Sequence, residues 1–279
     1  MAQTNKLAFA EIAEADATGR TREIYDDFKS SLGLPMINLV YRHLATMPGC
    51  LEWAWALLRP HFVGGAFARE AERLVAGLEL GERWSITRDE LRNAGVDAAA
   101  EAVIIQTLEA YNCANPMNQI ALAVLKREIE EHAPYDGEAP PETGSMPRRP
   151  TNDLPPMADL SALPKQTLDT LGVLATQAGV GGTAVMPTLY RHLTEWPGYL
   201  DIAVSAGARL VDDGSLDREA SALQKRAHNS ASRIPRHTTV LPAPSASQRY
   251  SLLGLIDLFP TLIARMIVIS VQLRRSMPS

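Results

Sequence analysis

Apolar residues recur at helical spacing along most of the chain. Ile24, Tyr25, Phe28 and Leu32 lie one, three and four residues apart, and residues 66–79 alternate small apolar side chains with charged ones. Such spacing places the apolar side chains on one face of a helix. No alternating run bounded by Asn-Gly or Asp-Gly occurs in the sequence. The pattern therefore predicts an all-α protein without strands.

Capping and stopping residues predict further helix boundaries. Thr87 is followed by acidic residues one turn later, and Gly95 can end that helix. A Leu/Trp-rich helix is predicted from Cys50 to Leu58, and Pro60 is expected to stop or bend it. A long buried helix is expected to begin at about residue 97.

Two eleven-residue segments of the chain are nearly the same. Residues 41–51 read YRHLATMPGCL and residues 190–200 read YRHLTEWPGYL, with seven identities at an offset of 149. A repeat of this kind predicts a tandem duplication. We expect two helical repeats that form a pseudo-twofold dimer within one chain, and a functional site at their junction.

The expected boundaries follow from the distribution of proline. Residues 133–157 hold seven of the nineteen prolines, which disfavours helix and predicts an extended linker. The first repeat is then residues 1–132 and the second is residues 158–279.

Residues 252–273 are apolar for about the length of a membrane-spanning helix. Asp257, Pro260 and Arg265 interrupt them, and charges at bilayer depth are costly. At an offset of 148 the segment corresponds to residues 104–125 of the first half. We interpret both as helices of the core, so no membrane is expected as a partner.

Composition narrows the function classes. The chain is 46% hydrophobic and 21% charged, which is typical of a globular protein, and its net charge of -5 argues against nucleic acid. Two cysteines and an amino terminus without a signal-peptide pattern favour the cytoplasm. No phosphate-binding, dinucleotide-binding or zinc-protease motif occurs, and the histidines lack metal-ligand spacing. We expect no cofactor and no metal, and a homodimer remains open.

The repeated His43 and His192 allow two interpretations. They can form a symmetric acid–base pair, or they can satisfy backbone groups at the ends of two equivalent helices. The second interpretation is favoured, and the adjacent Arg42 and Arg191 are taken as structural for the same reason.

Polar residues within the two long apolar helices are candidates for chemistry. Asn115 lies beside Pro116, and Glu109 corresponds to Asp257 at the offset of 148. Buried carboxylates and amides cost free energy unless they have partners. The alternative to a catalytic role is a buried ion pair between Asp257 and Arg265.

Four short motifs carry a resemblance to a known family. They are Leu34-Pro35, Leu-Ala-Thr-Met-Pro-Gly at 44–49, Asn-Cys-Ala-Asn-Pro at 112–116 and Leu-Thr-Glu-Trp-Pro at 193–197. In their order and spacing the chain resembles the group I 2-haloacid dehalogenases, which act on D- and L-substrates. The resemblance implies two fused helical repeats with the active site between them. It also implies direct hydrolysis of a carbon–halogen bond, in which an Asp is the general base and an Asn helps to hold the water.

The resemblance places the family's Asn at Asn115, but it places the catalytic Asp at Leu189. Leucine cannot take a proton from water, so the family mechanism cannot operate unchanged. Further positions that differ from the family pattern in this alignment are Met36, Asn118, Thr188 and Phe259, where Trp, Tyr, Ser and Tyr are expected, and Glu109 and Asp257, where aromatic residues are expected.

The sequence therefore favours a divergent, cofactor-independent enzyme acting on a small or medium organic molecule. Asn115, Asp257 and Glu109 are the expected catalytic residues, and elimination, isomerisation, cyclisation or hydrolysis from a new base are the candidate reactions. The expected lining of an apolar pocket is Met36, Leu39, Asn118, Thr188, Leu189, Phe259 and Ile263. Two alternatives remain, namely a true 2-haloacid dehalogenase with a relocated base and a non-catalytic binding or scaffold protein.

Overall fold

A computed structural model describes residues 10–81, 84–131, 154–181, 185–237, 239 and 241–278. Within these ranges every regular element is helical, which confirms the all-α prediction. The predicted linker lies outside the described residues except for 154–157, which are not helical. The division into two repeats stays a prediction.

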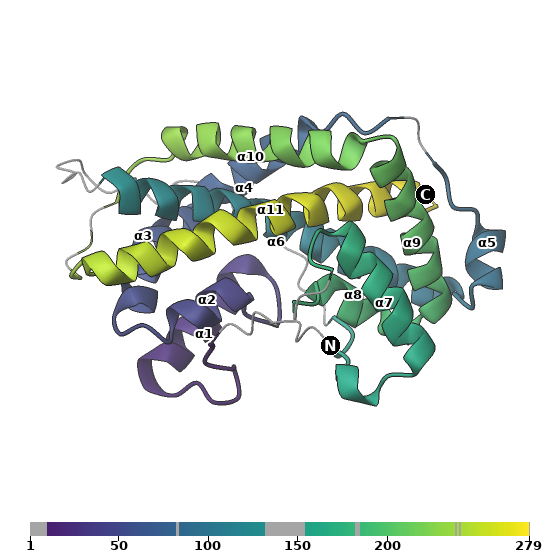
Figure 1. Ribbon diagram of the computed structural model, residues 1–279, viewed down its shortest axis with the longest axis horizontal. Coiled ribbons are helices and arrows are strands. Elements are labelled where there is room, and N and C mark those ends of the chain that lie inside the picture. Colours follow the sequence, from purple (N-terminus) through teal and green to yellow (C-terminus); the bar gives the residue numbers. More distant parts are fainter. Residues whose placement is uncertain are drawn as a thin grey trace, which may run out of the picture.

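The helices follow one another in a similar order in the two halves (Figure 1). The first half contains α1 (Gly19–Leu32), α2 (Leu39–Leu44), α3 (Cys50–Val63), α4 (Ala66–Ala76), α5 (Arg88–Asn93) and α6 (Ala98–Glu131). The second contains α7 (Lys165–Gln177), α8 (Thr188–His192), α9 (Pro197–Asp212), α10 (Ser215–Arg233) and α11 (Ala246–Ser276), with 3-10 turns η1 (Leu160–Ala162) and η2 (Leu193–Glu195).

The two longest helices, α6 and α11, form the centre of the molecule. They make the most extensive contact between any two elements, and both extend across the molecule (Figure 1). Asn112 on α6 joins them, because its Nδ2 donates to the Ser270 carbonyl oxygen at 3.3 Å and its Oδ1 accepts from Ser270 Oγ at 2.6 Å. The partly apolar α6 and the strongly apolar α11 thus bury each other, as the apolar pattern of both segments predicts.

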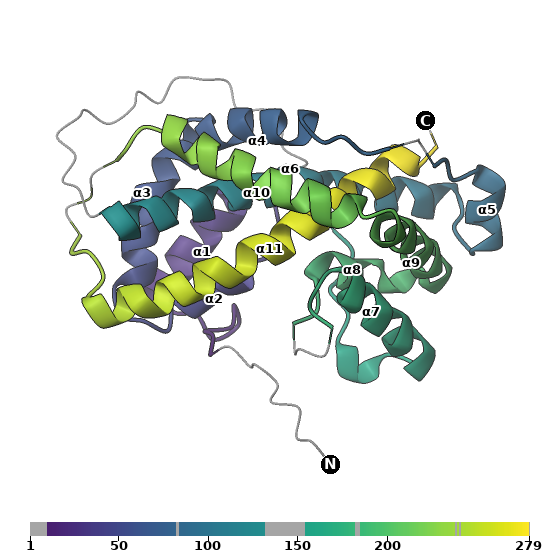
Figure 2. The same ribbon diagram turned by 45° about the horizontal axis from the view of Figure 1, so that its top comes forward.

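The shorter helices gather at the two ends of this central pair. Helices α1, α2 and α3 lie at one end and α7, α8 and α9 at the other, while α4 and α10 lie along the central helices (Figures 1 and 2). Glu70 of α4 is ion-paired with Arg233 of α10, which connects the two halves on that side.

Helix α5 crosses from the first half to the second. The Ile86 amide donates to the Ser276 carbonyl oxygen at 2.8 Å, and the start of α9 packs directly on the end of α5. Gly198 allows this approach, since a Cβ there would collide with the Ala94 backbone.

Local sequence signals explain several boundaries. Thr87 and Glu90 form the capping box that begins α5, and Gly95 follows that helix with a φ of 76°. Of the two effects expected of Pro60, a stop is wrong, because α3 continues through it to Val63, and a bend stays a prediction. A proline within a helix removes one hydrogen bond, and the buried apolar face of α3 outweighs that loss.

The repeated Tyr-Arg-His segments make matching contacts. His43 Nδ1 lies 2.6 Å from the Ala10 carbonyl oxygen, and His192 Nδ1 lies 2.5 Å from that of Pro155. The carbonyl oxygens of Arg42 and Arg191 accept from the amides of Ile12 and Ala158. These contacts favour the structural interpretation of both histidines and support the proposed duplication.

Helix α11 is long and apolar enough to cross a membrane by length and composition, and about 56% of its most apolar stretch is buried. It packs against α6, α9 and α10, as a core helix does.

We predict that His61 makes the fold sensitive to acid. This side chain is 1% exposed, and burial together with the nearby His237 and Arg127 lowers its pKa to about 4. Unfolded His61 takes up a proton near pH 6.5, so its contribution to stability is complete above that pH and is lost as the pH falls towards 4. Urea denaturation should show about 2 kcal/mol less stability at pH 4.5 than at pH 7 from this residue.

In His61→Phe this loss should be smaller by about that amount. His228→Gln is the control, because His228 is exposed and its replacement should keep the wild-type dependence. Equal acid sensitivity in His61→Phe and the wild type would contradict the assignment.

Candidate functional site

A cavity of about 220 Å³ lies where α2, α6, α8 and α11 meet, between the two halves of the chain. Its lining comes from both halves and from the segment that precedes α8. The lining residues are Glu11, Asn38, Leu39, Val40, Arg42, Tyr111, Asn115, Leu160, Val185, Met186, Pro187, Thr188, Leu189, Arg191, Phe259, Leu262, Ile263 and Met266. A space of this size accommodates a small organic molecule.

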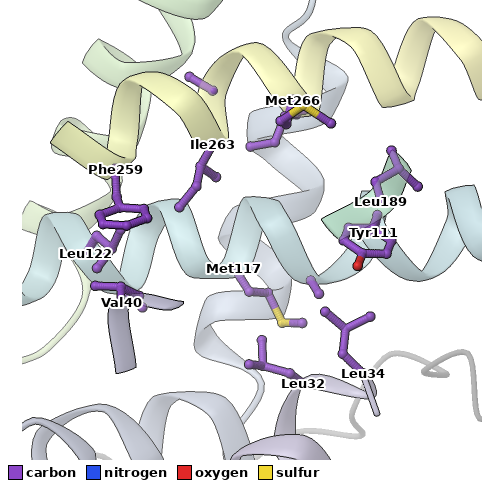
Figure 3. Packing of buried hydrophobic residues seen from close by; sticks show 14 of the residues in the cluster. Leu32, Leu34, Val40, Tyr111, Met117, Leu122, Leu189, Phe259, Ile263 and Met266 are labelled. Carbon is purple, nitrogen blue, oxygen red and sulfur yellow. The ribbon is translucent and has the colours of Figure 1, made fainter. Parts of the chain in front are cut away.

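Most of the wall is apolar. Phe259, Ile263 and Met266 project from α11 towards α6, and Leu189 of α8 lies beside Tyr111 (Figure 3). Ile263 and Met266 are three residues apart and therefore share one helix face. An apolar wall with few polar groups is typical of a ligand-binding pocket.

Tyr111 and Thr188 connect α6 to α8 at the cavity. Tyr111 Oη donates to Thr188 Oγ1 at 2.9 Å and lies 3.5 Å from the Met36 sulfur. Burial raises the pKa of the Tyr111 phenol well above its ordinary value, although the hydrogen bond to Thr188 and the charge of Arg191 oppose that shift. Tyr111 therefore stays neutral and is a hydrogen-bond donor at neutral pH.

Two amides at the cavity have unused hydrogen-bonding groups. Asn115 is only 7% exposed, and no described residue forms a hydrogen bond with its side chain. Asn38 Oδ1 is buried and also lacks a partner among the described residues. Because buried amide groups are normally satisfied, both are suited to bind a water molecule or a ligand.

Three charged residues line the cavity. Glu11 pairs with Arg42, whose Nε lies 2.9 Å from Glu11 Oε2. The segment that carries Glu11 is fixed by Tyr25, which donates to the Ile12 carbonyl oxygen at 2.9 Å. Arg191 instead donates from Nε and Nη2 to the Ala158 carbonyl oxygen at 3.1 and 2.7 Å. Glu11 is the only carboxylate among the described residues of the lining.

The structure brings six of the predicted site residues together at this cavity. They are Leu39, Asn115, Thr188, Leu189, Phe259 and Ile263. Met36 lies behind the wall as a contact of Tyr111, and Asn118 is fully buried, where its Oδ1 accepts from Tyr41 Oη at 3.0 Å. These two residues support the wall and do not line it.

The placement predicted for Asp257 and Glu109 is wrong. The Asp257 carboxylate is 60% exposed and pairs with Lys126, and Glu109 pairs with Arg274 at 2.8 Å on the surface. The alternative Asp257–Arg265 pair does not form either, since Arg265 pairs with Asp217. The face of α11 that carries Asp257 points away from the face that carries Phe259 and Ile263, and helical spacing alone did not reveal which one faces the cavity.

No group of three or more His, Cys, Asp and Glu side chains suited to a metal ion occurs in the part of the chain that the structure describes.

Comparison with known proteins connects this fold to one family. A configuration-inverting 2-haloacid dehalogenase of Alcaligenes xylosoxydans xylosoxydans is 24% identical over 213 residues, which cover 71% of this chain and 68% of that protein. An (R)-2-haloacid dehalogenase of Pseudomonas putida is 31% identical over 105 residues, or 36% of this chain and 35% of that protein. No protein-family model matches the chain.

Solved structures extend the likeness over nearly the whole chain. A D-2-haloacid dehalogenase in complex with L-LA superimposes with a TM-score of 0.78 at 18% identity, and a mutant of a D-2-haloacid dehalogenase with D-2-CPA does so with a TM-score of 0.75 at 17%. Each match covers 96% of both chains. The similarities in sequence and fold support the resemblance to the 2-haloacid dehalogenases that the four sequence motifs carry.

Sequence reasoning missed Glu11, Asn38 and Tyr111, and it took Arg42 and Arg191 as structural only. Glu11 precedes the first helix and belongs to no periodic pattern, so nothing in the sequence marked it. The two arginines did carry a signal, because they are identical residues of the repeated segment and a site was expected at the junction.

Proposed function

We propose that this protein is an enzyme that binds a small organic acid in the cavity between its two halves and acts on it by cofactor-independent acid–base chemistry. The observation that carries the proposal is Asn115, whose nearly buried amide has no partner among the described residues and lines a cavity with an apolar wall. An amide that faces a cavity and has no protein partner can both donate to and accept from a bound water or substrate. The related enzymes are named for 2-haloacids.

The proposed reaction is hydrolysis of the bond between carbon 2 and a leaving group such as chloride. A water held by the Asn115 amide attacks carbon 2, its proton passes to a carboxylate, and the halide leaves with the bonding electron pair. Leu189 cannot accept that proton. Glu11 lies at the cavity and is the base we propose, with Arg42 holding its carboxylate in place.

A second candidate is an elimination, isomerisation or cyclisation of a small acid. It is favoured by Leu189, which is 1% exposed and places an apolar side chain where the family resemblance expects the base. Loss of that base is compatible with a changed reaction in a conserved fold, because fold alone does not determine chemistry. A non-catalytic binding protein is the remaining alternative.

Halide release from D- and L-2-chloropropionate separates these candidates. We expect the wild type to release chloride from one enantiomer, and we expect Leu189→Asp to release it at least tenfold faster, because that variant adds a carboxylate at the family's position. The measurement is chloride production by the purified full-length chain.

Each outcome supports a different candidate function. If the wild type releases no chloride and the Leu189→Asp variant does, hydrolysis is not the native reaction and the second candidate is favoured. Silence from both proteins would contradict the proposed 2-haloacid substrate.

We predict that Asn115→Ala lowers the chloride release rate at least tenfold, because water loses the amide that aligns it. The matched control is Asn112→Ala, which removes an amide from the same helix that contacts Ser270 and does not line the cavity. Thermal denaturation should show both variants folded. An unchanged rate in Asn115→Ala would remove this residue from the mechanism.

Glu11→Gln tests the proposed base against the carboxylates expected from the sequence. We predict at least a hundredfold lower kcat in Glu11→Gln, since an amide cannot take the proton from water. Glu109→Gln and Asp257→Asn should keep kcat within twofold, because both carboxylates are paired with cations outside the cavity. The opposite ranking, with Asp257→Asn inactive and Glu11→Gln active, would reinstate the prediction from sequence.

A further inference from the structure

The charges at the cavity do not cancel. Glu11 and Arg42 form an ion pair, whereas Arg191 forms no ion pair with any carboxylate of the described residues. Asp159 lies near enough for Arg191 to help lower its pKa, but the Asp159 carboxylate accepts hydrogen bonds from the Ser161 amide and hydroxyl at 2.9 and 2.8 Å. Among its described lining residues the cavity therefore has one more positive than negative charge, and Arg191 carries it.

Comparison of the two Tyr-Arg-His segments suggests a reason why Arg191 forms no ion pair among the described residues. The Ile12 amide donates to the Arg42 carbonyl oxygen, and the Ala158 amide donates to the Arg191 carbonyl oxygen, so residues 12 and 158 are equivalent. The residue before Ile12 is Glu11, which pairs with Arg42. The residue before Ala158 is Met157, which has no charge. The same main-chain contact thus accompanies an ion pair at Arg42 and none at Arg191 among the described residues, while the histidine contacts, to Ala10 and to Pro155, differ by one residue in register.

Arg191 lines the cavity, and the main chain holds its guanidinium. Its Nε and Nη2 both donate to the Ala158 carbonyl oxygen, which fixes the plane of the guanidinium. Its Nη1 has no hydrogen bond to any described residue. A pre-oriented guanidinium with a remaining donor is well suited to bind a carboxylate.

Polar groups of the cavity lie on both α8 and α6. Thr188 lies three residues before Arg191 on α8 and accepts a hydrogen bond from Tyr111 of α6. Asn115 lies one helical turn beyond Tyr111, on the same face of α6. A ligand that lies between α8 and α6 therefore contacts the Arg191 cation on one side and the Asn115 amide on the other.

We propose that Arg191 is the residue that selects a carboxylate, binding the acid group of the ligand so that its carbon 2 lies towards Asn115. This inference rests on the proposed function for the identity of the ligand as a small 2-substituted acid. Arg191 is a specificity-determining residue and takes no proton in the reaction.

The test compares lactate with lactamide, which differ in charge and hardly at all in size. We expect the wild type to bind lactate at least tenfold more tightly than lactamide in an NMR titration of the full chain. In Arg191→Gln the two affinities should differ by less than twofold. The affinity for lactate should fall, and the affinity for lactamide should stay the same. If Arg191 had only a structural role, its replacement would weaken the binding of both ligands equally.

Two further variants complete the experiment. Arg265→Gln is the control, because Arg265 makes the same two-nitrogen contact to a main-chain oxygen, that of Gln177, and does not line the cavity. It should keep the wild-type ratio. Met157→Glu adds a carboxylate next to Ala158, as Glu11 lies next to Ile12. It should neutralise Arg191 and abolish the preference for lactate over lactamide without removing the arginine. This variant tests the proposal if Arg191→Gln does not fold.

The results separate the two proposals. Two outcomes would overturn the role of Arg191 and leave the proposed pocket intact. The first is an equal affinity of the wild type for lactate and lactamide, and the second is an undiminished affinity ratio in a folded Arg191→Gln or Met157→Glu variant. Absence of binding of both ligands to the wild type would overturn both the inference and the proposed substrate class.

Discussion

The packing of α6 against α11 is the contact on which the rest of the structure depends. Each helix is more than thirty residues long, and together they connect the two ends of the molecule. The cavity exists because α2 and α8 approach this pair from the sides and meet it at Tyr111, Asn115, Phe259 and Ile263. A change in the spacing of the two long helices would therefore alter the core and the proposed site together, since packed interiors transmit strain.

The proposed site combines two different physical environments. Its wall is mostly apolar, and electrostatic interactions are stronger beside apolar groups than in water, while the Glu11–Arg42 pair and Arg191 provide charge. Arg42 and Arg191 show how equivalent positions can acquire different roles. A single difference, Glu11 in one half and Met157 in the other, accompanies an ion pair at Arg42 and a cation at Arg191 that has no ion-pair partner among the described residues.

Periodicity and capping residues were enough to predict the helical class and most helix positions, including the box at Thr87 and Glu90. They could also assemble six of the cavity residues, because those residues lie on apolar faces or in motifs shared with a known family. They misplaced Asp257 and Glu109, since a polar residue inside an apolar helix can face either a cavity or solvent, and only tertiary packing decides between the two. Glu11 could not be predicted, because its position depends on contacts of the neighbouring main chain with the Arg42 carbonyl oxygen and the His43 and Tyr25 side chains.

The crossing of α5 has a consequence for how the chain is made. The Ile86 amide is satisfied by Ser276 on α11, and the end of α5 rests on Gly198 of α9. A segment synthesised early thus depends on helices that leave the ribosome more than a hundred residues later. At an elongation rate of about 5–20 residues per second, α5 waits on the order of ten seconds or more for its final neighbours. During synthesis the first half therefore lacks part of its packing. Its α5 segment reaches its final contacts only after α9 and α11 of the second half have been made.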